Sequence, residues 1–385
     1  MKAGIVQKIF LDHFEAYRRE RQLDSRQLKA AGSIMTCRTR DQGYHVDACP
    51  RDEYEVLKYN SCKHRSCPQC GATETQLWLE RRKNQALDCR YFHIVFTISH
   101  DLHIIWRANR KRFTKKMIRA AWRSLRELLL SWKWLGGLPG AIAVFQSWDD
   151  EMKEHCHLHF IVTAGGLNDD GRWINANAEF LLPTPVLASK FRGKFLAYLK
   201  EGFKDQELSV PRGKSIRQCL NLINKLGRKR WHADIEPSYE HANGVFKYVG
   251  RYIRRGPISE KRIIGYDGQN VKIAYAHKEK HENRSFTLPV DEFIGRLLRH
   301  VPKKGTHLVR AYGLFHPNCR AKLDLARKRL GQPPYMPVID KPTTHELLSQ
   351  MFPNLEGTCC PICGTALKTV YVSRRGRAPT WRLAA

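Results

Sequence analysis

The sequence predicts an α+β fold, with a Cys-rich head before the main body of the chain and a basic tail after it. Residues 90–99, 141–148 and 157–163 are rich in β-branched and aromatic side chains, which is typical of strands. Residues 104–132 instead carry apolar side chains at helical spacing. Most of the twelve cysteines lie near one end of the chain or the other, which points to metal-thiolate sites flanking the main body.

The remaining elements follow from the same patterns in chain order. We expect one or two short helices in residues 5–28 and a helix at 73–87, with Thr73 as its N-cap. Further helices are expected beyond Pro185, at 241–254 and at 293–301. A short strand is expected at 231–235, and residues 262–266 and 271–276 are expected to pair as a hairpin across Asp267-Gly268.

The charge balance indicates a polyanionic partner. Lys and Arg number 67 and Asp and Glu 37, a formal net charge of +30. Such self-repulsion is offset when the protein binds nucleic acid, which we favour over a merely basic protein or one that binds an acidic membrane surface. No apolar segment approaches the ~20 residues of a membrane span, and the first residues lack the apolar core of a signal peptide. Clustered cysteines at low density favour a reducing compartment, so we expect a cytoplasmic protein.

Two CPxC sequences, Cys67–Cys70 and Cys360–Cys363, predict zinc sites, because this turn aims two thiolates at one ion. Two such pairs are more than twelve randomly placed cysteines would give. For the first zinc we assign Cys49, Cys62, Cys67 and Cys70, with Cys37 and His45 as alternative ligands or part of a second site. For the second zinc we assign His316, Cys319, Cys360 and Cys363, with Cys359 as a competitor of Cys360. Neither set comes with an open coordination position, so both zinc ions are expected to be structural.

A His-x-His pair and a Tyr-x-x-x-Tyr pair are the candidate catalytic groups. In a strand, His157 and His159 share one face while Leu158 faces a core, so two imidazoles could hold one divalent ion. His155 lies on the same face nearer the start of the strand and is expected outside the first ligand shell. In the helix expected at 241–254, Tyr248 and Tyr252 share a face. The arginines beside them, Arg251, Arg254 and Arg255, favour a phosphate-binding face over a packed aromatic stripe.

These motifs, in this order, resemble a known family. A Cys-rich head precedes FHIVFTIS, then a strand with Gln146, then the His-x-His pair followed by VTAGGL, and finally WHADIEPSYEHANGVFKYVGRYIRRGPIS. The chain is similar over most of its length to the two-tyrosine HUH (histidine-hydrophobic-histidine) rolling-circle transposases of the bacterial insertion-sequence ninety-one group, which are related to Helitrons. It departs from that group at Cys49-Pro-Arg-Asp52, where the group often has CxxC, so His45, Cys37 or Asp52 is a candidate substitute ligand.

The resemblance implies an HUH-type central antiparallel sheet with the His-x-His strand in its middle and the tyrosine helix against it. Residues 1–89 would form a zinc-binding head that recognises DNA, 90–304 the catalytic domain and 305–385 a basic region with the second zinc. His157 and His159 would bind Mg²⁺ or Mn²⁺, with Gln146 as third ligand or Asp149 in its place. Tyr248 would make the first nick and a 5′-phosphotyrosine, Tyr252 would accept the second strand end, and Lys247 or the metal would favour the phenolate.

The basic helical segments are expected to hold the backbone of DNA, both at transposon ends and at the target. The residues we assign are Lys111, Arg112, Arg228, Lys229 and Arg230. Three alternatives stay open from the sequence. A replication initiator or relaxase would use the same chemistry, a zinc-finger regulator would bind DNA without catalysis, and a metal-dependent nuclease would cleave without a covalent intermediate.

Overall fold

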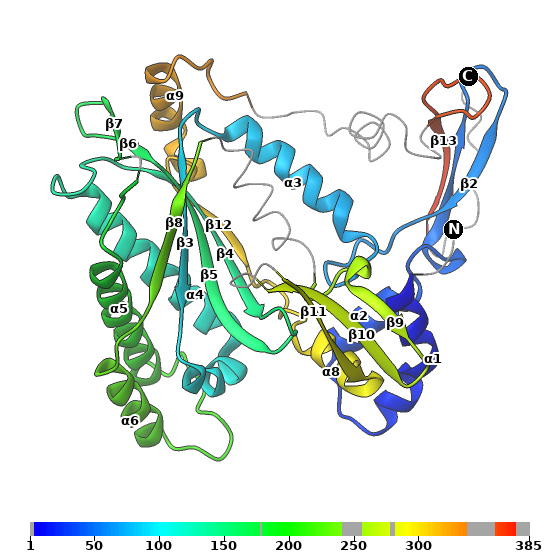
Figure 1. The fold of residues 1–385 in the computed structure, drawn as a ribbon, viewed down its shortest axis with the longest axis horizontal. Coiled ribbons are helices and arrows are strands. Elements are labelled where there is room, and N and C mark those ends of the chain that lie inside the picture. The colour runs from blue at the N-terminus through cyan, green and yellow to red at the C-terminus, as the bar shows by residue number, and fades with distance from the viewer. Residues whose placement is uncertain (1–3, 178, 241–255, 278–281, 337–358, 375–385) are drawn as a thin grey trace.

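The computed structural model describes residues 4–177, 179–240, 256–277, 282–336 and 359–374 (Figure 1). Within them the strands form a five-stranded sheet, two three-stranded sheets and a two-stranded hairpin, and every pairing between named strands is antiparallel. The α+β class with antiparallel sheets is therefore confirmed. The helix expected at residues 241–254 lies outside the described residues.

The five-stranded sheet is the centre of the molecule, with strand order β12-β4-β5-β3-β8. Its strands are β3 (Tyr91–Thr97), β4 (Gly140–Trp148), β5 (Glu154–Thr163), β8 (Ala233–Tyr239) and β12 (Val309–Gly313). The His-x-His strand, β5, is the middle strand, as expected. It begins three residues earlier than predicted, so that it also includes His155.

One face of this sheet is covered by helices and forms the largest hydrophobic core (Figure 1). The covering helices are α4 (His103–Leu130), α5 (Thr184–Lys204) and α6 (Ile216–Gly227). Leu158 and Phe160 of β5 point into this core, where Phe160 contacts Phe96 edge-on with ring centroids 5.7 Å apart. Because side chains alternate along a strand, the residues between them must point to the opposite face.

Toward one end of the strands, the opposite face is covered by two other helices. There Ile142, Val144 and Ile161 pack with side chains from α3 (Gly71–Gln85) and α9 (Arg320–Arg329). The hairpin of β6 (Gly165–Leu167) and β7 (Trp173–Asn175) lies at the same end. Helix α3 begins two residues before the predicted start, with Cys70 rather than Thr73 at its N-cap, because the turn of the CPxC sequence leads straight into it.

A second core is formed by the two N-terminal helices together with elements between residues 258 and 301. Helices α1 (Ile5–Arg19) and α2 (Ser25–Met35) pack against α8 (Val290–Arg299). A sheet of β9 (Ile263–Tyr266), β10 (Asn270–His277) and β11 (Glu282–Pro289) lies beside them. The expected hairpin is therefore a three-stranded sheet. The sequence pattern missed β11 because most of its side chains are polar or exposed.

The third sheet, of order β13-β1-β2, pairs the two ends of the chain. Its strands are β1 (Gly43–Ala48), β2 (Glu55–Tyr59) and β13 (Lys368–Arg374). Residues 305–385, which we expected to form a separate basic region, thus contribute strands to two other parts of the fold. Strand β13 joins the sheet of the head, and β12 completes the central sheet. None of the helices in the described ranges has the length and apolar character needed to cross a membrane.

His300 links α8 to the central sheet and makes the fold sensitive to acid. Its ring bonds the Ser147 hydroxyl at 3.1 Å and the Met152 carbonyl at 3.0 Å. Burial lowers the pKa of His300 to about 4. As the pH falls below about 6.5, the unfolded chain binds this proton first, so acidification favours unfolding.

We therefore predict that His300 removes about 2 kcal/mol of unfolding free energy between pH 7.5 and pH 5. Urea unfolding of His300→Gln at both pH values should show a smaller loss than the parent chain. His232→Gln, at an exposed histidine, is the matched control. An unchanged acid sensitivity in His300→Gln would contradict the assignment.

Candidate functional site

Strand β5 places two imidazoles side by side on the face of the central sheet opposite α4 and α5. The rings of His157 and His159 have centroids 4.7 Å apart and an interplanar angle of 79°. Both residues are buried, with exposed fractions of 8% and 5%. The Nδ1 atom of His157 hydrogen-bonds the His155 carbonyl at 2.9 Å, which fixes that ring. Their shared face is what the alternation of the sequence predicted.

The register of β4 against β5 brings Gln146 to the same place. Gln146 pairs directly with His157, so their side chains lie on one face. Its Nε2 donates to the Trp148 carbonyl at 2.9 Å, which turns Oε1 away from that contact. Within the described residues this buried Oε1 accepts no hydrogen bond. Asp149, the alternative, instead accepts backbone N–H groups of Glu151 and Lys153 and so holds the β4–β5 turn.

Two further strands each add a group that the sequence analysis missed. His93 of β3 is fully buried and its Nε2 lies 2.9 Å from Nδ1 of His159. Its Nδ1 lies 2.8 Å from a carboxylate oxygen of Glu236 on β8. The carboxylate accepts, so His93 Nδ1 carries the proton and Nε2 accepts in turn from His159 Nδ1. In this arrangement Nε2 of His159 presents a lone pair.

The signal for His93 was present in FHIVFTIS, where His93 stands on the alternate face from Phe92 and Ile94. The position of Glu236 depends on how β8 pairs with β3, which no local pattern reveals.

Three further histidines continue the line of rings from His157 past the start of β5. His155 lies 5.0 Å from His157 and 5.3 Å from His100 between ring centroids, and His100 lies 4.9 Å from His103. Burial lowers the pKa of His103 to about 4, and burial together with His100 lowers the pKa of His155. The His103 ring is therefore neutral near pH 7 and adds no positive charge to this row.

The donor set of this site suits a divalent ion. Two imidazoles and an amide carbonyl offer nitrogen and oxygen ligands, and the partnerless Gln146 Oε1 marks a place for an electrophile. The hydrogen bond from His159 Nδ1 to His93 is the kind of outer contact that orients a metal-binding histidine. The predicted tyrosine-helix residues, Tyr248, Tyr252, Lys247, Arg251, Arg254 and Arg255, lie outside the described residues.

A cluster of four cysteines lies where α2 ends and α3 begins. Cys37, Cys62, Cys67 and Cys70 bring their sulfur atoms within 4.8 Å of one another. Hydrogen bonds from the other three thiols lower the pKa of Cys37, so the cluster favours a thiolate, the form that binds zinc. The predicted grouping is corrected here, because Cys37 takes the place that we gave to Cys49. His45 instead bonds Asn60 at 2.9 Å.

The second cluster joins the two ends of the chain. Cys49, Glu53, Cys360 and Cys363 bring one ligand atom each within 4.8 Å of one another. The sulfur atoms of Cys49 and Cys363 are 3.5 Å apart. Backbone N–H groups two residues further on donate to the sulfurs of Cys49 and Cys360, both at 3.4 Å.

This arrangement corrects the predicted second set, in which His316 and Cys319 accompanied Cys360 and Cys363. His316 caps a 3₁₀ turn (Pro317–Cys319) by accepting the Asn318 N–H at 3.2 Å. That turn leads into α9 beside the central sheet, whereas Cys360 and Cys363 lie beside β1 and β2. The HxxC sequence is therefore a helix start. The fourth ligand of the second cluster is Glu53, which no sequence motif marked. It follows directly after Asp52, which we considered as a substitute zinc ligand.

The predicted DNA-binding residues fall into two groups. Lys111 and Arg112 lie on α4, where Lys111 lines a surface cavity and Arg112 donates to the Glu207 carbonyl. Arg228, Lys229 and Arg230 follow the end of α6, and Lys229 lies 3.7 Å from Asp101.

Comparison with known proteins agrees with the layout of the chain. Residues 140–322 match a family model described as "Putative transposase", and residues 9–98 match one described as "Transposase zinc-binding domain". The chain is 33% identical over 334 residues to "Putative transposase y4qJ" of Sinorhizobium fredii, covering 85% of this chain and 84% of that protein. It is 24% identical over 360 residues to the transposase for insertion sequence element IS801 of Pseudomonas savastanoi pv. phaseolicola, covering 89% and 82%. No solved structure matches.

The regrouped ligands predict how zinc content responds to single substitutions. Purified protein should contain two zinc ions per chain by elemental analysis, and Cys67→Ser should lose the first. Cys49→Ser and Cys363→Ser should each lose the second and keep the first, because both sulfurs belong to one cluster. Cys319→Ser is the matched control and should keep both ions. Loss of zinc from Cys319→Ser would restore the set predicted from sequence.

Proposed function

Because the chain belongs to the insertion-sequence ninety-one (IS91) family of transposases, we propose that it nicks and rejoins single-stranded DNA at transposon ends through a 5′-phosphotyrosine. The observation that carries this proposal is the convergence of His157, His159 and Gln146 on one face of the central sheet. Their position in the region that matches the transposase model supports it.

The three donors would hold Mg²⁺ or Mn²⁺. When bound, the ion would polarise the scissile phosphate and offset the charge of the transition state. The chain's own contribution is orientation. Glu236 fixes the tautomer of His93, His93 fixes that of His159, and the Trp148 carbonyl fixes the amide of Gln146. Ligands held in this way lose little rotamer freedom when they bind, which favours a reproducible geometry.

Tyrosine would be the nucleophile. The phenolate oxygen of Tyr248 would attack the phosphorus, forming an oxygen–phosphorus bond while the bond to the 3′-oxygen breaks. That oxygen takes up a proton and leaves as a free 3′-hydroxyl, and the tyrosine keeps the 5′-phosphate. The link conserves the energy of the phosphodiester, so a 3′-hydroxyl can later attack it and rejoin the strand. Tyr252 would accept the second strand end in the same way.

Zinc would serve the fold rather than the reaction. Among the described residues, the sheet β13-β1-β2 has a small core, in which Cys49, Cys360 and Leu367 are the fully buried members. So few apolar side chains stabilise a three-stranded sheet weakly, and a closed metal site would supply the missing folding free energy. The matched zinc-binding model, which ends at residue 98, supports this role for the first cluster.

A covalent-adduct assay tests the proposed chemistry. Labelled single-stranded oligonucleotides that span the DNA on either side of the gene are incubated with protein and Mn²⁺, and adducts are separated by denaturing electrophoresis. Tyr248→Phe should abolish the first adduct, and the double variant with Tyr252→Phe should form none. Tyr59→Phe, at a half-exposed tyrosine of β2, is the matched control. An adduct in the double variant would show that neither tyrosine is the nucleophile.

The hydrogen-bond chain predicts a loss of metal affinity on substitution of His93. His93→Leu should weaken Mn²⁺ binding about 10- to 100-fold, because His159 loses the acceptor that sets its tautomer. His93→Gln should retain part of the affinity, since an amide can replace both contacts. Binding is measured without DNA by the electron paramagnetic resonance signal of free Mn²⁺, with His232→Gln as control. Parental Mn²⁺ affinity in His93→Leu would contradict this role.

A further inference from the structure

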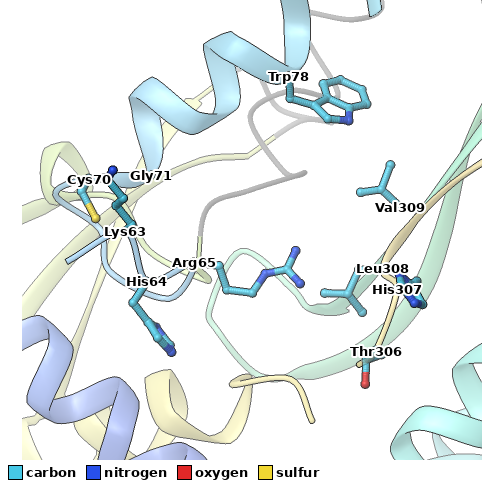
Figure 2. Close-up of a pocket in the computed structure, with 10 residues that line it drawn as sticks. All are labelled: Lys63, His64, Arg65, Cys70, Gly71, Trp78, Thr306, His307, Leu308 and Val309. Atoms are coloured by element: carbon cyan, nitrogen blue, oxygen red, sulfur yellow. The ribbon is translucent and has the colours of Figure 1, made fainter. Parts of the chain in front are cut away.

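A cavity of about 360 Å³ lies between the first cysteine cluster and the edge of the central sheet (Figure 2). Its walls come from the loop with Lys63, His64 and Arg65, from the start of α3, and from residues 306–309 that lead into β12. Figure 2 shows the Arg65 guanidinium reaching into the space, with the Trp78 indole of α3 on another wall. Among the described lining residues there is no carboxylate.

A second cavity of about 300 Å³ adjoins the first around the β12 edge of the sheet, because Arg310 in its wall pairs with Ala143, whose side chain faces the core under α4. The two share Thr306 and His307, and the second is lined by Lys111 and Lys115 of α4 and by Arg310 of β12. Its described lining residues also include no acidic group. The side-chain oxygen of Thr306 and Nε of Arg310 are buried without a hydrogen-bond partner in the described ranges. The walls therefore offer cations and unsatisfied polar atoms.

The fixed positive charge of the first cavity comes from Lys63 and Arg65, which both line it.

Strand register relates the first cavity to the histidine site. Val309, which lines the first cavity, pairs with Val144, and Val144 pairs with His159. Directly paired residues point to the same face of a sheet. The cavity wall therefore lies on the histidine face, two strand spacings or about 10 Å from His159. A strand whose phosphate is held at His157 and His159 would meet the first cavity on this face and the second around the β12 edge of the sheet.

We propose that the two cavities form one binding channel for the single-stranded DNA that flanks the scissile phosphate. This inference rests on the proposed function. Lys63, Arg65, Lys111 and Lys115 would contact phosphates, and the Trp78 wall would contact a base. Open cavities of this volume fit individual nucleotides rather than a duplex. Cations along the backbone with an aromatic wall are the usual elements of single-strand binding.

The cations near Cys70 have a second explanation, which the experiment must separate. A zinc bound by four thiolates carries a net negative charge, and Lys63 and Arg65 could serve only to offset it. Lys111 and Lys115 lie on α4, away from the cluster, so their contribution to DNA binding cannot come from stabilising zinc.

The test measures binding of a fluorescent 20-nucleotide oligo-dT by anisotropy over a salt series, without Mg²⁺ or Mn²⁺. Lys63→Gln/Arg65→Gln and Lys111→Gln/Lys115→Gln should each bind at least about tenfold more weakly at 0.1 M salt. Each pair should also reduce the slope of log K against log salt by about 1.4, the value for two lost single-strand phosphate contacts. Lys200→Gln/Arg212→Gln removes the same charge at exposed positions of α5 and the loop after it, and should change binding little.

The zinc content of each variant is measured in parallel. Parental affinity and slope in both cavity pairs would overturn the proposal, as would an equal loss in the control pair. A weakened Lys63→Gln/Arg65→Gln variant that has lost zinc, with an unaffected Lys111→Gln/Lys115→Gln variant, would assign the cations to the metal centre and also overturn it. The binding assay needs neither the tyrosines nor a catalytic metal. Its result is therefore independent of the covalent-adduct assay, and either proposal can be wrong while the other is right.

Discussion

The alternation of side chains along β5 is the constraint on which the site depends. Leu158 and Phe160 are held in the core under α4 and α5, and this fixes His157 and His159 on the other face. A slip of one residue would bury the imidazoles among aromatic side chains and expose the core. The free energy of that core therefore sets the register, and the register sets which neighbours the histidines meet.

Antiparallel pairing brings residues of the neighbouring strands to the histidines of β5. Gln146 stands across from His157, and His93 and Glu236 stand on the same face one and two strands away. The resulting chain from Glu236 through His93 to His159 consists of buried or half-buried hydrogen bonds of 2.8 and 2.9 Å. Each hydrogen bond decides which nitrogen of the next ring carries the proton. The Glu236 carboxylate, three strands away from Gln146, therefore determines that Nε2 of His159 has the lone pair that a metal could use.

Sequence patterns predicted those parts whose signal is local. The strands with His93, Gln146 and His157, and the helix α4, show periodicity within their own residues, and their predicted bounds agree with the structure to within a few residues. The cysteine grouping failed for a physical reason, since Cys49 meets Cys360 and Cys363 only because β13 pairs with β1 from the far end of the chain. Glu53 carried no motif at all. Contacts between residues about 310 positions apart leave no trace in spacing.

The same long-range pairing joins the two Cys-rich regions of the sequence in one sheet of order β13-β1-β2. The first cluster fixes the start of α3, and α3 then packs through Trp78 and Leu79 on the histidine face of the central sheet. Its loop thus faces residues 306–309 across a cavity whose fixed charges are positive. A metal centre placed there would hold one wall of the channel in position without touching the reacting phosphate. Zinc and catalysis would then be coupled through geometry alone, so loss of zinc should affect DNA placement before it affects the donors of the histidine site.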